Sequence, residues 1–406
     1  MSAKRWTSIL ESPAIATSSD DFIAQCATVE PQPAAPPAAT PAPAFALALS
    51  GGGFRATLCS MGAARFLADA GLLSRLRFSS SVSGGSVANG ILACGYRAVA
   101  DDGFTGQAFD AHVLDPLVRR ISGSSLERKL IRGIPRILGR RTRTDLLAEA
   151  FDEWWFDGRM LNELPADVRW IINATNLTTG VGFAFERDVV GDYVLGRLST
   201  TRLPMRVAAA VAASAAVPGA FAEVVIDAPF PCADGRVARL LDGGAYDNSG
   251  LQPLDEVTDA CLVAVNAGGT FQVGKLGKVP IARDLQRANA ILYRQSTGLR
   301  RQFMVERFQA WEKAVADGQA PPGFGRRGVL FSLGTTMDAT DEWREGRPEH
   351  EEWREALAMV PTTFDKFNAD LCERLIYRGW WLTGATLSRY HRELLPAKLP
   401  AWGMIT

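Results

Sequence analysis

A serine between an apolar stretch and two glycines is the first candidate for chemistry in this sequence. Ser83 directly follows residues 76–82, LRFSSSV, which we predict to form a strand. Small residues around a serine allow the sharp strand-to-helix turn of a nucleophile elbow, G-x-S-x-G, which exposes the hydroxyl. Ser81 replaces the first glycine of that pattern, so the match is incomplete. We predict that Ser83 is a nucleophile and that Ser86 supports the first turn of the following helix.

A run of three glycines is the second candidate. Gly51, Gly52 and Gly53 follow the apolar residues 44–50. Glycines let the backbone approach a ligand closely, and N–H groups at a helix start attract negative charge. Such a loop can hold a phosphate or stabilise an oxyanion, but the P-loop pattern and the dinucleotide pattern GxGxxG are both absent. Taken alone, the run is also compatible with a simple tight turn.

An aspartate supplies a possible base. Asp242 follows the apolar-rich residues 237–241 and precedes two glycines, which would leave its carboxylate open to a site. The alternative for this motif alone is an ordinary Asp-Gly turn. The chain has only three histidines, His112, His350 and His391, and only His391 has a plausible place in a Ser-Asp-His order. We expect all three at the surface, which disfavours a histidine-dependent site.

The segments that must position these residues alternate between strands and helices. Strands are predicted at 44–50, 76–82, 170–177, 182–185, 237–241, 261–265 and 329–333. Helices are predicted at 56–70, 84–100, 206–216, 281–317 (with one break) and 363–379. Strand, glycine turn and helix in repeated succession indicate an α/β fold with a parallel sheet.

The composition excludes several classes of protein. Among 406 residues, 44 Lys and Arg balance 44 Asp and Glu, which argues against a protein that coats nucleic acid. We find neither a stretch of about 18 uncharged apolar residues nor the apolar core of a secretory signal. The six cysteines form no CxxC pair, which is typical of buried thiols in a reducing compartment. We therefore expect a cytoplasmic protein without a metal site.

Together, the motifs resemble those of the patatin-like phospholipase family and the related cytosolic phospholipase A and lysophospholipase catalytic domains. In chain order they are SGGGFR at 50–55, SVSGG at 81–85, NATNL at 173–177, ASAAVPGAF at 213–221 and DGG at 242–244. The resemblance extends over residues 44–270 and is weaker beyond them. Each motif alone is common, whereas their order and spacing are specific.

The resemblance implies a lipid acyl hydrolase that cleaves acyl esters of phospholipids or lysophospholipids and needs no cofactor. Ser83 would attack the ester and form an acyl-enzyme, and Asp242 would accept the serine proton. The backbone N–H groups of Gly52 and Gly53 would form the oxyanion hole, with Gly51 shaping the turn. An aspartate acting as this base must be partly desolvated and must touch the serine.

The resemblance also implies a three-layer fold, with a central, mostly parallel sheet flanked by helices. The catalytic core would span 44–270, after an N-terminal extension and Pro/Ala-rich linker at 1–43. Residues 271–406 would pack on the core as a helical and strand region. Arg55 occupies a position that is cationic in the family, where it would contact a substrate phosphate or fix the glycine loop.

The motifs are compatible with two other functions. A carboxylesterase or acyltransferase acting on non-phospholipid acyl groups would use the same dyad, so the motifs do not separate it from a phospholipase. A catalytically degenerate regulatory module is the other alternative, and Ser81 is its only support.

A basic segment at 128–143 alternates cations with aliphatic residues. Such an element can lie on an anionic membrane surface, which suits an enzyme with a membrane phospholipid substrate and peripheral membrane contact. It can also form a pocket for a small anionic regulator, or simply a solvated helix face. A protein activator is a further partner that the resemblance allows.

Overall fold

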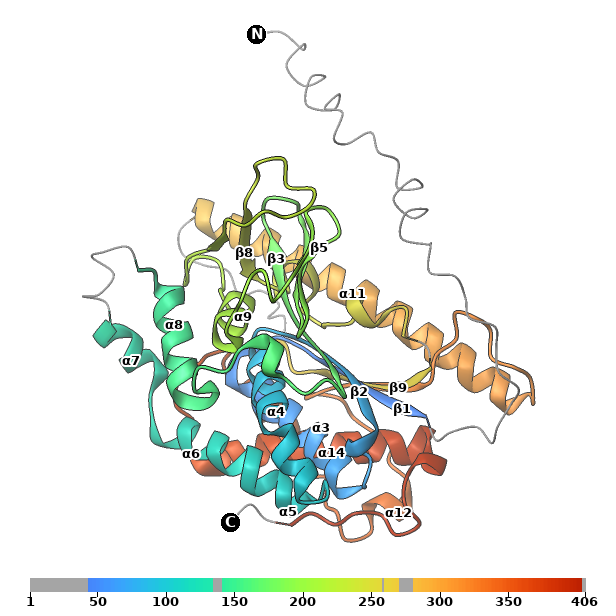
Figure 1. The fold of residues 1–406 in the computed structure, drawn as a ribbon. Helices are drawn as coiled ribbons and strands as arrows, with labels where there is room; N and C mark the ends of the chain where they lie inside the picture. The colour runs from blue at the N-terminus through green and yellow to red at the C-terminus, as the bar shows by residue number, and fades with distance from the viewer. Residues whose placement is uncertain (1–42, 134–140, 258, 270–279, 404–406) are drawn as a thin grey trace. The chain divides into compact units, whose positions relative to one another are not determined.

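A mixed sheet of ten strands lies at the centre of the computed structural model, which describes residues 43–133, 141–257, 259–269 and 280–403 (Figure 1). The strand order is β10-β9-β1-β2-β3-β4-β5-β6, and β8 pairs with both β3 and β7. The strands are β1 (Ala44–Leu49), β2 (Leu76–Val82), β3 (Arg169–Asn176), β4 (Val181–Phe185), β5 (Val189–Asp192), β6 (Gly196–Ser199), β7 (Val224–Ile226), β8 (Ala238–Asp242), β9 (Ala260–Asn266) and β10 (Gly328–Ser332).

The half of the sheet from β10 to β3 is parallel, and the strands beyond β3 are antiparallel. Residues 45–49 of β1 are all buried, because helices cover both faces of this half. The carboxyl ends of parallel strands meet at one edge. The turns that follow β1, β2 and β9 therefore lie together, and they include Ser50, Ser83 and Ala267.

Strand β3 brings the predicted nucleophile and base to the same place. Asn173 of β3 lies opposite Val82 of β2, one residue before Ser83. The next residue, Ala174, lies opposite Asp242 at the end of the antiparallel strand β8. The register of β3 thus sets the ends of β2 and β8 side by side.

Helices form the two outer layers. They are α3 (Gly53–Asp69), α4 (Gly84–Asp101), α5 (Gly106–Phe109), α6 (Asp115–Gly123), α7 (Leu126–Gly133), α8 (Arg143–Phe151), α9 (Val207–Ser214), α10 (Gly244–Asp247), α11 (Pro280–Ala316), α12 (Asp341–Arg344), α13 (Glu351–Ala358) and α14 (Ala369–Tyr390). Helices α3, α4 and α14 cover one face of the sheet, and α11 covers the other (Figure 1). The predicted three-layer α/β fold is confirmed.

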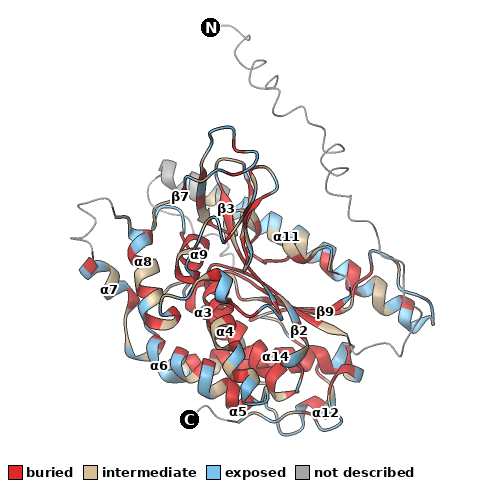
Figure 2. Cartoon of the chain, viewed as in Figure 1, coloured by how far each residue is buried: buried red, intermediate tan, exposed pale blue. Residues whose placement is uncertain are grey.

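The C-terminal region is built into the larger of the two cores (Figure 2). Helices α3 and α14 touch backbone to backbone: a Cβ atom at Gly379 would stand 2.0 Å from the carbonyl oxygen of Cys59. A Cβ atom at Gly62 would stand 2.0 Å from the carbonyl oxygen of Ile376. The tryptophan pair at 380–381 is fully buried here.

On the opposite face, a smaller core lies between the sheet and α11. Met304 and Phe308 of α11 pack against Ala46 and Ala48 of β1 and Ile171 of β3. Alanines on this face of β1 let the long helix approach the sheet closely.

Some predicted elements differ from those observed. Helix α11 is continuous where a break was predicted, and the last helix begins at Ala369 rather than at 363. The side chain of Asn368 caps α14 by accepting the N–H of Leu371 at 2.7 Å, which fixes this start. The basic segment is divided between α7 and the start of α8, and its residues 134–140 lie outside the described residues, as do residues 1–42.

Candidate active site

Ser83 occupies a strained turn between β2 and α4. Its backbone has φ 52° and ψ −118°, a conformation that residues other than glycine rarely adopt. The next residue must be small, because a Cβ atom at Gly84 would stand 2.1 Å from the carbonyl oxygen of Gly53. This geometry is that of a nucleophile elbow. Ser83 is 5% exposed.

A second serine holds the elbow in place. The backbone N–H of Ser83 donates to Oγ of Ser214 at 2.9 Å. The Ser214 hydroxyl in turn donates to the carbonyl oxygen of Asn173 at 2.6 Å. Ser214 is the last residue of α9, so helix α9 and strand β3 both anchor the turn. Ser214 belongs to the segment 213–221 that resembles the family, but no role was predicted for it from the sequence.

Ser81 fits the position where the elbow pattern has glycine. Its side chain is fully buried, and its hydroxyl donates to the carbonyl oxygen of Ile171 at 3.1 Å. The same hydroxyl accepts the side-chain amide of Asn89 at 2.9 Å. The extra hydroxyl is therefore satisfied inside the protein, and the departure from glycine does not disturb the turn.

Asp242 lies against Ser83 with its carboxylate almost fully buried. It accepts hydrogen bonds from the Ser83 side chain and from the N–H of Gly244, the latter at 2.8 Å. Burial raises the pKa of this carboxyl to about 6, although the two hydrogen bonds act in the opposite direction. Thr175 donates to the backbone carbonyl of Asp242 at 2.9 Å, which fixes the end of β8.

The glycine run requires glycine at two positions. Gly52 has φ 147° and Gly53 has φ 61°, both in the range that L residues avoid. Cβ atoms there would stand 2.3 Å from the carbonyl oxygens of Ala267 and Thr363, respectively. The N–H of Gly51 is already used, since it donates to the carbonyl oxygen of Asn248 at 3.0 Å.

The N–H groups of Gly52 and Gly53 remain as donors. No hydrogen bond between described residues occupies either of them. Gly51 thus shapes the turn, and its two successors can present N–H groups to a ligand beside Ser83.

Arg55 is an anchor for the loops around the site. It is 2% exposed, and its Nε donates to the carbonyl oxygen of Ala267 at 3.0 Å. Its other nitrogens donate to the carbonyl oxygen of Val360 and, at 3.0 Å, to Oγ1 of Thr362. Burial lowers the pKa of this guanidinium. These contacts tie Arg55 to the turn after β9 and to residues 360–362, and both roles predicted for it stay predictions.

A cavity of about 660 Å³ opens onto Ser83 and Asp242. Helix α11 forms one wall of it, with Leu292, Tyr293 and Leu299. The Tyr293 side chain is hydrogen-bonded to Asn248, and burial raises its pKa to about 12. No sequence signal connected α11 with the motifs, because its lining residues lie more than 40 positions beyond Asp242.

Comparison with known proteins identifies a family for this chain. The sequence model of the family described as "patatin-like phospholipase" matches residues 47–255, just over half of the chain. The chain belongs to the patatin-like phospholipase family. A comparison with curated proteins gives no match.

The fold is also found in a human enzyme of known structure. Human GIVD cytosolic phospholipase A2 is similar at 12% identity and a TM-score of 0.54, over 87% of this chain and 60% of that one. Its complex with methyl gamma-linolenyl fluorophosphonate matches at 13% identity and a TM-score of 0.50, with the same coverage. VipD from Legionella pneumophila is found at 15% identity and a TM-score of 0.33, over 83% of this chain and 67% of that one. The chain thus spans about 60% of the human phospholipase.

All three histidines of this family member lie away from Ser83. His112 is paired with Asp102 at 2.6 Å, and His350 stacks on Trp353 at 3.8 Å. His391 was predicted at the surface, and this prediction is wrong: the residue is fully buried.

The environment of His391 explains its burial. Its Nε2 lies 3.2 Å from the carbonyl oxygen of Gly328, and its ring packs on Trp311. Burial lowers the pKa of this imidazole. Gly328 begins β10, so His391 lies at the sheet edge opposite the carboxyl ends of β1 and β2. It therefore has no access to Ser83.

The described part of the chain contains no group of three or more His, Cys, Asp or Glu side chains able to hold a metal ion. Within the same residues, no helix combines the length and apolar character needed to cross a membrane.

Proposed function

We propose that this protein cleaves acyl esters of phospholipids or lysophospholipids with Ser83 as nucleophile and Asp242 as general base. The observation that carries the proposal is the hydrogen-bonded pair Ser83–Asp242, located beside the unoccupied N–H groups of the glycine loop. Membership of the patatin-like phospholipase family supports a lipid acyl ester as the substrate.

The first half of the reaction forms an acyl-enzyme. The Ser83 hydroxyl attacks the ester carbonyl carbon while Asp242 accepts its proton, and the carbonyl oxygen becomes an oxyanion. A pKa of about 6 makes this carboxylate a better base than an ordinary aspartate, while leaving it ionised at neutral pH. The N–H groups of Gly52 and Gly53 stabilise the oxyanion, and loss of one such donor typically costs about 10²–10³ in rate.

The second half releases the products and restores the site. Collapse of the tetrahedral intermediate breaks the ester bond, and the departing alcohol takes the proton from Asp242. Water then attacks the acyl-Ser83 ester, with Asp242 accepting a proton from the water. The second intermediate breaks down to the free fatty acid, and the proton returns to Ser83. No group beyond the protein, the ester and water is required.

The rim of the cavity supports an acyl chain as ligand. Val217, Leu292 and Leu299 line the cavity, yet they are 40%, 63% and 60% exposed. Exposed apolar side chains gathered at a cavity mouth favour contact with a lipid or an apolar surface. A peripheral approach to a membrane through this rim would let an acyl ester reach Ser83 without leaving the lipid phase entirely.

The decisive experiment compares the wild type with Ser83→Ala on phospholipid and lysophospholipid vesicles, with released fatty acids measured by mass spectrometry. The variant is expected to retain its fold and lose hydrolysis. Ser60→Ala is the matched control, since its buried hydroxyl has no partner among the described residues. Hydrolysis that survives in Ser83→Ala would remove the proposed nucleophile.

A substrate panel separates the remaining functions. Activity on short soluble esters but not on vesicles would indicate a carboxylesterase. Failure of a fluorophosphonate probe to label Ser83 would indicate a degenerate site. Labelling together with vesicle hydrolysis is the expected result.

A further inference from the structure

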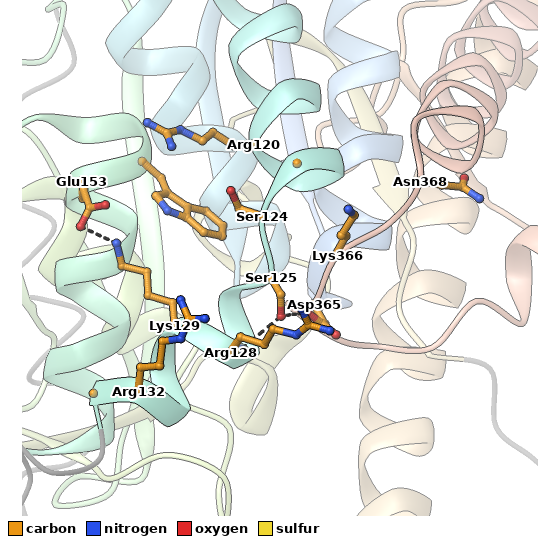
Figure 3. A pocket seen from close by; sticks show the side chains of 13 residues that line it. Arg120, Ser124, Ser125, Arg128, Lys129, Arg132, Glu153, Asp365, Lys366 and Asn368 are labelled. Atoms are coloured by element: carbon orange, nitrogen blue, oxygen red, sulfur yellow. Dashed lines mark hydrogen bonds and ion pairs between the residues drawn. The ribbon is translucent and has the colours of Figure 1, made fainter.

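A second cavity, of about 910 Å³, lies apart from Ser83 and is strongly basic (Figure 3). Its walls come from the end of α6, from α7, from the π-helical turn Asp152–Phe156 and from the chain that precedes α14. Five cationic side chains line it: Arg120, Arg128, Lys129, Arg132 and Lys366. The chain as a whole is neutral, so this concentration of positive charge is local.

Acidic side chains balance only part of that charge. Lys129 forms an ion pair with Glu153, as Figure 3 shows. The other lining carboxylate, Asp365, accepts a hydrogen bond from the hydroxyl of Ser125. The other four lining cations form no ion pair with another described residue; they are Arg120, Arg128, Arg132 and Lys366. Like charges around one concavity repel each other and create a field that attracts anions.

The size and lining of the cavity indicate what kind of anion it would take. A volume of about 910 Å³ is far larger than a single phosphate needs. The lining adds the hydroxyls of Ser124 and Ser125 and the buried Trp154 to the cations. Arginine donates two parallel hydrogen bonds to phosphate oxygens, and lysine acts as a point charge. Cations spread over several elements fit several phosphate groups better than one.

A short stretch of chain connects this cavity with the glycine loop. Asp365 and Lys366 line the basic cavity. Two residues before Asp365, the carbonyl oxygen of Thr363 accepts the N–H of Phe54 at 2.8 Å. The same carbonyl lies so close to Gly53 that a Cβ atom there would stand 2.3 Å away. Residues 360–368 therefore contact both sites.

We propose that the basic cavity binds a ligand carrying two or more phosphate groups, and that the bound ligand holds residues 360–368 and thereby the glycine loop. Binding itself does not depend on the proposed hydrolase function. An effect of the ligand on hydrolysis would depend on that function. The experiments therefore measure ligand binding and the protection of backbone amides from hydrogen exchange.

Binding is tested by titrating the full-length protein with inorganic tripolyphosphate in a calorimeter. We expect saturable binding at one site per chain and weaker binding of orthophosphate. Arg132→Gln combined with Lys366→Gln should weaken tripolyphosphate binding by at least about tenfold, because two charge-assisted contacts are lost. Both side chains are exposed, so the variant is expected to keep the wild-type melting temperature.

Arg119→Gln is the matched control. Arg119 is exposed, neighbours Arg120 on α6 and does not line the cavity. The Arg119→Gln variant loses one positive charge beside the cavity, against two inside it in the double variant, and it should leave the affinity unchanged because Arg119 does not line the cavity. The proposal is overturned if tripolyphosphate shows no saturable binding, or if Arg119→Gln weakens binding as much as the double variant does.

The source of the phosphates is distinguished by vesicle flotation. Phosphatidylcholine vesicles are compared with vesicles that also contain a phosphatidylinositol bisphosphate. Binding to the second kind alone, lost in the double variant, assigns the cavity to a lipid headgroup. Binding of tripolyphosphate without any vesicle binding assigns it to a soluble polyphosphate.

The connection to the glycine loop is tested by hydrogen exchange. Tripolyphosphate should slow amide exchange in residues 360–368 and in 51–54 of the wild type, but not in the double variant. Slowed exchange in the lining of the cavity, without any slowing in residues 51–54, would overturn the connection. This readout is independent of whether Ser83 performs hydrolysis.

Discussion

The hydroxyl of Ser214 accepts the backbone N–H of Ser83 at 2.9 Å and donates to the carbonyl oxygen of Asn173 at 2.6 Å. One side chain thus links helix α9, strand β3 and the elbow. The Ser83 backbone, at φ 52° and ψ −118°, persists only because its surroundings hold it there. Ser214 supplies part of that restraint without contacting the reacting atoms.

Ser214→Ala is expected to lower kcat with little change in KM. Removing the acceptor leaves the buried N–H of Ser83 unpaired, which costs about 1–3 kcal/mol and would slow the reaction by about ten- to hundredfold. The kinetics on lysophospholipid, together with a circular dichroism spectrum of the variant, check this. Ser60→Ala should behave as wild type. A change in KM alone would contradict a role in positioning Ser83.

Features that depend on neighbouring residues could be predicted from the sequence. Strand β2 is predicted with its observed bounds, since residues 76–82 are followed at once by the serine and two glycines. Asp242 is recognised for the same reason: a strand and a glycine pair flank it. The local sequence suffices here because a sharp turn limits the residue types that can form it.

Features that depend on contacts between residues far apart in the chain could not be predicted from the sequence. Thr363 supports Gly53 from more than 300 positions away, and its segment was predicted as part of a helix. Tyr293 enters the cavity only because α11 crosses the sheet face. His391 was expected at the surface, whereas packing against Trp311 buries it. No periodicity in the sequence encodes these contacts.

The pH dependence of hydrolysis should report Asp242. The base must be deprotonated, and burial raises its pKa to about 6. We therefore expect kcat/KM to rise with pH, to pass half its plateau at about pH 6 and to level off above pH 7. A profile measured on a soluble ester avoids changes in the vesicles. A midpoint near pH 4 would show that the Asp242 carboxyl of the substrate-free enzyme is not desolvated, which would contradict its burial in the structure.

Asp242→Asn should stabilise the protein at alkaline pH while abolishing hydrolysis. The pKa of the carboxyl is about 6 in the folded state against 3.8 for an unperturbed aspartate. The folded state thus binds more protons between these values, so the contribution of this group to stability is complete below pH 4 and is lost as pH rises through 6. At pH 8 the charged form costs up to about 3 kcal/mol, which asparagine avoids.

Urea denaturation of Asp242→Asn at pH 8 and pH 4.5 measures this difference. The gain in unfolding free energy should be largest at pH 8 and should shrink toward pH 4.5. Asp338→Asn is the control, because the Asp338 side chain is 83% exposed. An equal gain at both pH values would contradict desolvation of Asp242 as its cause.

Gly84→Ala should separate the elbow from the glycine loop. Its Cβ atom would stand 2.1 Å from the carbonyl oxygen of Gly53, so the loop must move away from Ser83. Displaced oxyanion donors predict a loss of about 10²–10³ in the rate of Ser83 labelling by a fluorophosphonate. Gly298→Ala on α11, where a Cβ atom meets nothing within 4 Å, should label normally. Both variants should retain the helical circular dichroism of the wild type. Labelling of Gly84→Ala at the wild-type rate would contradict the dependence of Ser83 reactivity on this contact.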